Sequence, residues 1–272
     1  MRQRGPGYRR LLSSPILSAS AAVHVGAAAA VLLHPRAWPW ALGAVVANHA
    51  ALTAAGLWPR SQLLGPNWIR LPAASGARGE VAITIDDGPD PAVTPRVLEQ
   101  LAEHRAQATF FCVGELVERY AHLAQEIVRR GHTVENHSHR HRHNFSLLGP
   151  GGMRSEIARA QESISRVTGS SPWFFRAPAG LRNPFLDPVL DSLQLRLASW
   201  TRRGFDTVNR NADSVYQRLT NRLCSGDILL LHDGHAALGA TGQPVVLEVL
   251  PRLLETFNAQ QLTAVTLRAA LL

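Results

Sequence analysis

Histidines are concentrated in one short segment of this 272-residue sequence. Five of its twelve histidines fall within residues 132–143. His137 and His141 are four residues apart, which on a helical turn places two imidazoles on one face, where both can bind one metal ion. The same spacing relates His139 to His143, so spacing alone leaves two candidate pairs. Two histidines and a carboxylate form a common divalent-metal site that keeps positions open for water and substrate.

Two adjacent carboxylates, Asp86 and Asp87, follow the apolar run at residues 81–85. Like charges this close repel each other, and the alternation of side chains along a strand points the two groups apart. One carboxylate can therefore bind a cation while the other acts as a general base. The alternative is a solvated turn, because the Asp-Gly-Pro sequence that follows favours turns.

Two further candidates each follow an apolar run. Arg176 comes after an aromatic segment and could neutralise a carboxylate in a cleft, or it could be a surface arginine before the Pro-Ala-Gly turn. His232 comes after an unbroken apolar run, which would hold it rigidly at its position. A histidine there suits general acid chemistry near neutral pH, whereas the alternative is a solvated loop residue.

The elements that must position these residues alternate along the chain. Helical stretches at 93–105, 115–130 and 155–169 carry apolar residues at three- and four-residue spacing. They separate short runs of strand-forming residues, and this alternation predicts a parallel α/β architecture in which seven or eight units could close a barrel. The strand-forming runs are 81–85, 108–113, 132–135, 173–175, 195–200, 227–231 and 262–267.

Polar, titratable residues follow five of these seven runs. In α/β folds the carboxyl ends of parallel strands meet at one edge, and catalytic groups lie there. The carboxylates, the histidine cluster, Arg176 and His232 are therefore expected to converge. This agreement among several strand ends is stronger evidence for a common site than any one motif.

The first 79 residues differ from the rest. No charged residue occurs in 11–35 or 37–59, and each stretch exceeds the roughly 20 residues that cross a bilayer. The two stretches predict a membrane hairpin with tryptophans near its ends, although alanine contributes little apolar character and His24, Asn48 and His49 are costly in lipid. A signal peptide and a helical pair packed on the domain are the alternatives.

Charge composition excludes several functions and suggests an orientation. All 28 basic residues are arginine, so Schiff-base catalysis and a phosphate-loop lysine are excluded, and two cysteines cannot build a cysteine-rich metal site. Residues 80–272 hold 20 arginines and 20 acids, and this neutrality disfavours nucleic-acid binding. By the positive-inside rule, arginines on both sides of the hairpin favour a cytoplasmic catalytic domain. These arginines are Arg2, Arg4, Arg9, Arg10, Arg60, Arg70 and Arg78.

Five segments together resemble a known family. In order and spacing, TIDDGPDP, NHSHRH, RAPAG, WTRRGFD and LLLHDG are similar to the five motifs of the polysaccharide deacetylases, the NodB-homology esterases. The resemblance covers about residues 80–267. It implies a distorted (β/α) barrel of about seven strands, and removal of N-acetyl or related acyl groups from a sugar or glycan by hydrolysis.

Carried over residue by residue, the resemblance implies a catalytic pair. Asp86 would be the general base that activates water, held by Arg176. His232 would be the general acid that protonates the leaving amine, oriented by Asp206. The assignment of Asp206 is the least secure, because the fourth motif is only partly matched.

The resemblance also implies a metal site and an acyl pocket. Asp87, His137 and His141 would bind a divalent metal, with zinc expected first, and this choice resolves the tie with His139 and His143. The pocket and its oxyanion donor would be formed by Leu230, Trp200 and the backbone N–H of Ala179.

The sequence departs from the family pattern at three positions. Ala179 replaces an aromatic residue, Arg203 stands where aspartate is common, and Thr207 stands where tryptophan is common. A smaller pocket wall and the adjacent Arg202 and Arg203 suit a different ligand, for example one with phosphate. Alternatively, the two arginines form a solvated turn.

The resulting hypothesis is a membrane-anchored, metal-dependent deacetylase of a bacterial cytoplasmic membrane. Residues 1–58 would form the arginine-rich start and the two apolar helices, 59–79 a linker, and 80–272 the catalytic domain. The substrate would be an acylated sugar or glycan, which a lipid could carry if the domain faces the cytoplasm. Alternatives are an O-acetyl esterase, a deformylase of a lipid-linked sugar, and a non-catalytic carbohydrate-binding protein. The last is disfavoured because the base, ligand and acid positions are all intact.

Overall fold

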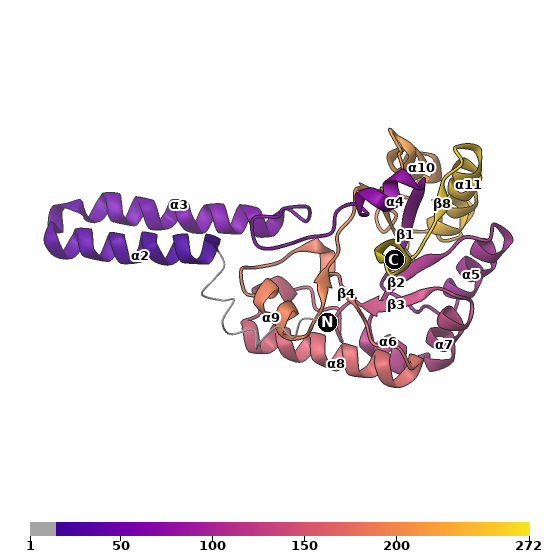
Figure 1. Ribbon diagram of the computed structural model, residues 1–272, viewed down its shortest axis with the longest axis horizontal. Helices are drawn as coiled ribbons and strands as arrows, with labels where there is room; N and C mark the ends of the chain where they lie inside the picture. The colour runs from indigo at the N-terminus through magenta and orange to yellow at the C-terminus, as the bar shows by residue number, and fades with distance from the viewer. Residues whose placement is uncertain (1–14) are drawn as a thin grey trace.

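The computed structural model describes residues 15–272, in which two long helices project from an α/β domain (Figure 1). These helices are α2, Pro15–Leu33, and α3, Trp38–Leu57, and the 3-10 turn η1, Pro35–Ala37, joins them. They lie side by side and point away from the domain, so they do not form a helical pair packed on it (Figure 1). Four arginines used for the predicted orientation lie outside the described residues: Arg2, Arg4, Arg9 and Arg10.

Polar side chains within the hairpin bond to one another between the two helices. The Asn48 amide donates to the Ser20 hydroxyl at 2.8 Å, and the Nε2 atoms of His24 and His49 lie 3.1 Å apart. His24 Nδ1 is also 2.7 Å from the Ser20 carbonyl oxygen. These contacts offset part of the cost of placing such groups in an apolar environment. Both helices are long and apolar enough to span a bilayer.

A sheet of parallel strands forms the centre of the domain. Its order is β5-β4-β3-β2-β1-β7-β6, and β8 pairs with the start of β1. In the described structure, β5 and β6 end this path and do not pair with each other, so the sheet is an open, distorted half-barrel. The strands are β1 Glu80–Asp86, β2 Ala108–Cys112, β3 Thr133–Asn136, β4 Phe174–Phe175, β5 Arg196–Leu197, β6 Arg202–Arg203, β7 Ile228–His232 and β8 Thr263–Ala264.

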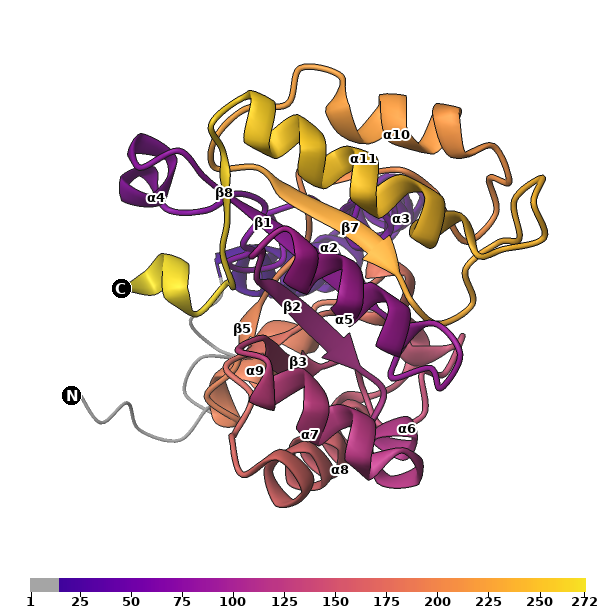
Figure 2. The same ribbon diagram turned by 90° about the vertical axis from the view of Figure 1, so that its right-hand side faces the viewer.

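Helices surround the outside of the half-barrel (Figure 2). Their apolar faces and the outward side chains of β1, β2 and β7 form the main hydrophobic core. Helix α8 is followed by Gly169, which caps its end with a φ of 70°, a value that glycine readily adopts. The helices are α4 Ala73–Ala77, α5 Thr94–Glu103, α6 Gly114–Arg119, α7 Ala121–Arg129, α8 Pro150–Thr168, α9 Leu186–Ser192, α10 Ala212–Thr220 and α11 Val245–Ala259, with 3-10 turns η2 Phe145–Leu147, η3 Pro178–Gly180 and η4 Ala269–Leu271.

Strand register brings the polar strand ends together. On β1, the fully buried Ile83 and Ile85 alternate with Thr84 and Asp86, which face the interior of the half-barrel. Asp86 is paired in register with His232 at the end of β7. The predicted convergence of strand ends is therefore observed.

The predicted α/β fold is confirmed, with two differences in detail. All seven predicted strands are present, and β6 is an additional strand within the fourth motif. The helical stretch 115–130 is two helices, because the backbone at Tyr120 leaves the helical region with φ −119° and ψ 49°. The apolar spacing of residues 115–130 continues across the break, so periodicity alone predicts one helix.

Residues 59–79, whose composition predicts a linker, pack against the half-barrel. Ser61, Leu64 and Leu71 are buried in this segment. Trp68 forms a parallel bridge with Ala198, beside β5, and contacts the Phe174 ring edge-on at 5.2 Å. The segment thus lies along the open side of the sheet and covers the edge next to β5.

Candidate active site

The two adjacent carboxylates lie where β1 ends and the chain turns. Asp86 is the last residue of the strand, and Asp87 has a φ of 74°, a conformation that non-glycine residues seldom adopt. Side chains at Gly88 and Gly234 would collide with Asp233 and with the Asp87 backbone, respectively. The close packing of this turn fixes Asp87 in its unusual conformation and separates the directions of the two carboxylates.

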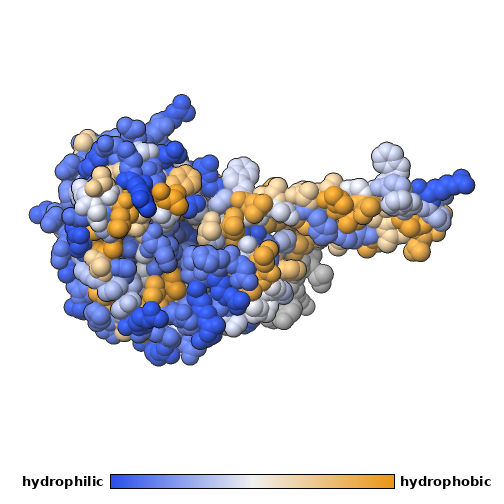
Figure 3. Space-filling model, turned by 180° about the vertical axis from the view of Figure 1, so that it is seen from behind, coloured by the Kyte–Doolittle hydropathy of each residue, from blue (hydrophilic) through white to orange (hydrophobic). Residues whose placement is uncertain are grey.

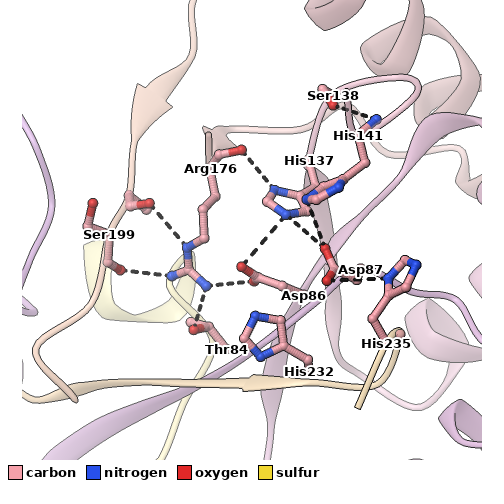
Figure 4. Close-up of polar contacts among 12 residues, drawn as sticks. Thr84, Asp86, Asp87, His137, Ser138, His141, Arg176, Ser199, His232 and His235 are labelled. Carbon is pink, nitrogen blue, oxygen red and sulfur yellow. Dashed lines mark hydrogen bonds and ion pairs between the residues drawn. The ribbon is translucent and has the colours of Figure 1, made fainter. Parts of the chain in front are cut away.

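Asp87, His137 and His141 bring three potential metal-binding atoms together (Figure 4). Asp87 Oδ1 is 3.1 Å from His137 Nε2 and 3.2 Å from His141 Nε2, and all three ligand atoms lie within 4.8 Å of one another. Within the part of the chain that the structure describes, this is the one such group found. His139 and His143, the alternative pair, do not belong to it.

The surroundings of these three residues fit a divalent cation. His137 Nδ1 donates to the Arg176 carbonyl oxygen at 2.9 Å, which leaves its Nε2 lone pair directed at the site, as in many metal centres. The His141 backbone N–H donates to the Ser138 hydroxyl and fixes the second imidazole. Asp87 Oδ1 is buried and makes no hydrogen bond with any described residue, although two imidazole nitrogens face it. A cation would satisfy this oxygen.

Local electrostatics favour the metal-binding protonation states of Asp87 and His141, whereas for His137 the Asp86 and Asp87 carboxylates outweigh burial and raise the pKa. Burial raises the pKa of Asp87, but the contacts with His137 and His235 outweigh it and hold the pKa well below its usual range. Burial lowers the pKa of His141 to about 4, with the charge of His137 acting in the same direction. The carboxylate is therefore ionised and this imidazole neutral at physiological pH, the forms that bind a metal.

Arg176 holds Asp86 from the interior of the half-barrel. Its Nη1 atom is 2.7 Å from Asp86 Oδ1 and 2.8 Å from the Thr84 hydroxyl. Its other nitrogens donate to the carbonyl oxygens of Ala198 and Ser199. The guanidinium is 1% exposed, so it cannot turn away, and Asp86 keeps one orientation (Figure 4).

His232 and Asp206 form a second buried pair. Nδ1 of His232 is 2.8 Å from one Asp206 oxygen, and the other oxygen accepts the His232 backbone N–H at 2.8 Å. Burial lowers the pKa of His232, but the Asp206 charge more than offsets it and raises the pKa to about 9. Because Nδ1 bonds to Asp206, Nε2 is the nitrogen left to meet a substrate. Asp206, the least secure assignment made from the sequence, is therefore in direct contact with His232.

One cleft of about 540 Å³ connects these groups. Asp86 and His232 line it together with the three metal-binding candidates, whereas Arg176 and Asp206 lie buried behind its wall. Ala179 has a φ of 55°, so the turn that carries it is held in a seldom-used conformation. The three residues expected around the acyl group all line the cleft: Ala179, Leu230 and Trp200.

Two residues in the site were not predicted. Thr84 bonds to Arg176, and its position two residues before Asp86 on the same strand face was a usable signal. His235 Nδ1 lies 3.6 Å from Asp87 Oδ2, three residues after His232, and no family motif marked it. For His235, the sequence contains no spacing pattern that would distinguish a site residue from a structural one.

The two consecutive arginines have different surroundings. Arg202 pairs with Asp227 at 2.5 Å and is directed away from the cleft. Arg203 lines the cleft, and its guanidinium lies 5.3 Å from the Trp200 ring centre and 4.8 Å from that of Phe205. Its Nε is buried and makes no hydrogen bond within residues 15–272. Arg203 therefore presents a positive charge to the cleft.

Comparison with known proteins identifies the family. The family profile described as polysaccharide deacetylase matches residues 73–198. A peptidoglycan-N-acetylglucosamine deacetylase of Bacillus cereus is 34% identical over 156 residues, which are 57% of this chain and 72% of the relative. This chain is a polysaccharide deacetylase family member. It is a hydrolase of carbon–nitrogen bonds other than peptide bonds.

Two other relatives agree with this assignment. A chitooligosaccharide deacetylase of Azorhizobium caulinodans is 32% identical to this deacetylase over 158 residues, 58% of this chain and 75% of the relative. The structure of a family 4 carbohydrate esterase from Streptomyces lividans in complex with acetate has a TM-score of 0.62 and 32% identity. The superposed region covers 68% of this chain and 91% of the esterase chain.

Proposed function

We propose that this deacetylase removes N-acetyl groups from an N-acetylated glycan of the peptidoglycan or chitooligosaccharide type. The observation that carries the proposal is the convergence of a fixed carboxylate, Asp86, and a fixed histidine, His232, on one cleft beside a metal-binding triad. Amide hydrolysis needs a base for water and an acid for the leaving nitrogen. The two groups are held independently, one by Arg176 and the other by Asp206.

Asp87, His137 and His141 would hold a divalent ion, which we propose is zinc. When bound, this ion supplies Lewis-acid polarisation of the acyl carbonyl and lowers the pKa of water. Two imidazoles and one carboxylate are a usual zinc donor set with open positions. The fixed orientation of His137 by the Arg176 carbonyl supports this assignment.

Asp86 accepts a proton from the water that attacks the acyl carbon. Arg176 restrains the carboxylate at 2.7 Å and keeps one oxygen engaged, so the other oxygen faces the cleft. This restraint lowers the entropic cost of reaching the attacking geometry. Arg176 therefore acts as a positioning residue.

The acyl group would lie between Leu230 and Trp200, whose apolar surfaces suit a methyl group. The backbone N–H of Ala179 donates to the oxyanion that develops as water adds. One such donor is worth on the order of 3 kcal/mol in the transition state. Arg203 favours a glycan with an acidic group near the acetamide, because its charge faces the cleft.

His232 donates its Nε2 proton to the leaving nitrogen as the carbon–nitrogen bond breaks. The products are acetate and a free amine on the sugar. Asp206 stabilises the imidazolium form before this transfer, since its charge raises the pKa of His232. General acid help of this kind contributes about 100- to 10,000-fold.

Asp86→Asn tests the proposed base. We expect loss of acetate release from N-acetylated chitooligosaccharides, with zinc binding retained by calorimetry because Asp87, His137 and His141 are untouched. The matched control is Asp213→Asn, whose exposed carboxylate pairs with Arg252 on the surface. Retained activity in Asp86→Asn would refute the assignment. Detection of a free amine in the product separates N-deacetylation from the O-acetyl alternative.

We also propose that α2 and α3 anchor the enzyme in a membrane as a hairpin. Their side chains are largely exposed and apolar, and only 6% of the apolar stretch of the first helix and 11% of that of the second are buried. Arg60, Arg70 and Arg78 follow the second helix and favour a cytoplasmic catalytic domain. A C-terminal reporter fusion tests this orientation. A cytoplasmic signal supports lipid-carried precursors as substrates. An external signal contradicts the hairpin and favours finished glycan polymers as substrates.

A further inference from the structure

The hairpin is joined to the catalytic domain by a fixed contact. The Arg182 backbone N–H donates to the Gly56 carbonyl at 3.1 Å, and the Arg182 guanidinium donates to the Ser61 carbonyl. A side chain at Gly56 would collide with the Arg182 carbonyl, so helix and loop approach as closely as backbones can. The Arg182 side chain is buried, although its residue type is normally exposed. The end of α3 is therefore part of the domain.

The chain that leaves α3 is fixed in the same way. The Pro59 carbonyl accepts hydrogen bonds from the Ser199 hydroxyl and the Asn67 amide. The Trp68 N–H donates to the Leu197 carbonyl, and the Trp68 carbonyl accepts the Ser199 N–H. A flexible tether between the hairpin and the domain would lack such contacts, so this stretch of the chain is not one. The domain consequently keeps one orientation relative to the hairpin axis.

A second loop is bonded into the same region. The Asn183 amide donates to the carbonyl oxygens of Ser146 and Leu148 on either side of Leu147. The Phe185 N–H donates to the Asn183 side-chain oxygen. Through residues 182–185, the turn at 145–148 and the end of α3 form one continuous surface.

This continuous surface carries exposed apolar side chains. Leu147 is 83% exposed, Leu63 is 64% exposed, and large apolar residues at three further positions are also exposed. In the view of Figure 3, apolar side chains extend along the helices and onto the adjoining part of the domain. We call the following five residues the apolar collar: Leu57, Trp58, Leu63, Leu147 and Phe185.

The collar lies at the level where a bilayer around the hairpin would end. Helix α2 has 19 residues, about 28 Å at about 1.5 Å per residue, close to the roughly 30 Å of a hydrocarbon core. Trp38 and Trp40 are exposed at the far turn of the hairpin, and Trp58 is exposed at the near end. Tryptophans at both ends are typical of the two membrane interfaces.

We infer that the apolar collar lies on the phospholipid interface, so the catalytic domain rests on the bilayer in one fixed orientation. This inference rests on the hairpin anchor proposed above. The occupant of the surface is the lipid interface because the collar continues directly from helices with membrane-spanning length. Pro59 packs against Gly180, which lines the cleft, so one cleft wall is held close to the headgroups.

Depth-dependent quenching in vesicles tests the inference with the full chain. Cysteines that replace Leu147 or Phe185 carry a polarity-sensitive fluorophore, in a Cys224→Ser background whose one remaining native cysteine, Cys112, is buried. The vesicles contain phosphatidylcholine and phosphatidylglycerol, with doxyl groups at shallow or deep acyl positions. Val25→Cys, within α2, reports insertion, and His122→Cys, on α7 far from the hairpin, is the matched exposed control (Figure 1).

We expect shallow doxyl lipids to quench the labels at 147 and 185 at least about twofold more than the label at 122. The label at 25 should be quenched best by deep doxyl lipids. Quenching at 25 without quenching at 147 and 185 would overturn the collar, because the domain would then be free of the surface. Absence of quenching at 25 would overturn it as well, by removing the anchor. Acetate release by the same preparations reports the deacetylase separately.

Gly56→Ala adds a test of the fixed orientation. The new methyl group collides with the Arg182 carbonyl, so the domain should loosen and the quenching at 147 should fall while that at 25 stays. Gly43→Ala is the matched control on the same helix, because no atom lies within 4 Å of the added methyl. Equal quenching at 147 in both variants would contradict the role of the Gly56 contact.

Discussion

Replacing Asp206 with asparagine removes the charge that keeps His232 protonated, while side-chain size hardly changes. In the native protein, burial lowers the pKa of His232, and Asp206 outweighs that effect and raises it to about 9. The difference from the ordinary value of about 6.5 corresponds to about 3 kcal/mol in favour of the imidazolium. Without the Asp206 carboxylate the burial remains and only the charges of Asp86 and Asp87 oppose it, so the pKa should fall toward the ordinary value of about 6.5.

The consequence for the reaction depends on pH. A general acid with a raised pKa is available below that pKa and is lost as pH rises through it. At pH 8 the protonated fraction of His232 is about 0.9 with a pKa of about 9, and about 0.03 with a pKa of about 6.5. We therefore expect kcat/KM to fall by up to about thirtyfold at pH 8 and by much less near pH 5.5. A bound divalent ion lowers the pKa in both proteins, so metal occupancy must be matched.

The assay is the pH profile of acetate release from an N-acetylated oligosaccharide between pH 5 and 10. Asp206→Asn should move the alkaline limb of kcat/KM to lower pH, whereas Asp213→Asn on the surface should leave it in place. Thermal unfolding of both variants checks that the fold persists. A profile of Asp206→Asn that is merely scaled down, with its alkaline limb unmoved, would refute the idea that Asp206 sets the protonation of the acid.

Three further changes test other parts of the site and the core. His141→Ala should weaken zinc binding to the apo protein at least about 100-fold by calorimetry, and unchanged affinity would exclude it as a ligand. Arg203→Ala should lower kcat/KM about tenfold for a glycan with a carboxylate and less than twofold for a neutral chitooligosaccharide; equal losses would argue against charge recognition. Burial, with the charge of Arg130, lowers the pKa of His132 to about 4. The unfolded state therefore binds a proton that the folded state does not, and stability is lost as pH falls from about 6.5 to 4, by up to about 3 kcal/mol. Chemical denaturation of His132→Leu should lack this part of the pH dependence, whereas exposed His122→Gln should retain it.

The sequence could indicate which residues meet at the candidate site, because strand ends fix where these residues must lie. Asp86 and His232 follow apolar runs that become adjacent strands, so their meeting required no knowledge of loops. Spacing could not separate His137 and His141 from the other histidine pair; the turn at Ser138 and the position of Asp87 make that choice. Such information lies in loop conformations, which local patterns describe poorly.

The parts that were not predicted depend on distant or very short contacts. Strand β6 consists of two arginines, which carry no apolar alternation, and it forms because β7 offers a free edge. Residues 59–79 have a linker composition, yet Trp68 packs against Phe174, more than 100 positions later in the chain. Propensities evaluated in a short window contain nothing about such contacts.

Residues 59–79 lie along the open side of the half-barrel. Their position therefore matters for the design of a soluble version of this enzyme. A protein shortened to start at residue 80 would lose Trp68 from the Phe174 ring and Pro59 from the back of Gly180. It would expose the edge beside β5 to other molecules, and unprotected edges promote aggregation. A start between α3 and Pro59 removes the apolar hairpin but retains the barrel wall, so solubility and an intact cleft can be sought together.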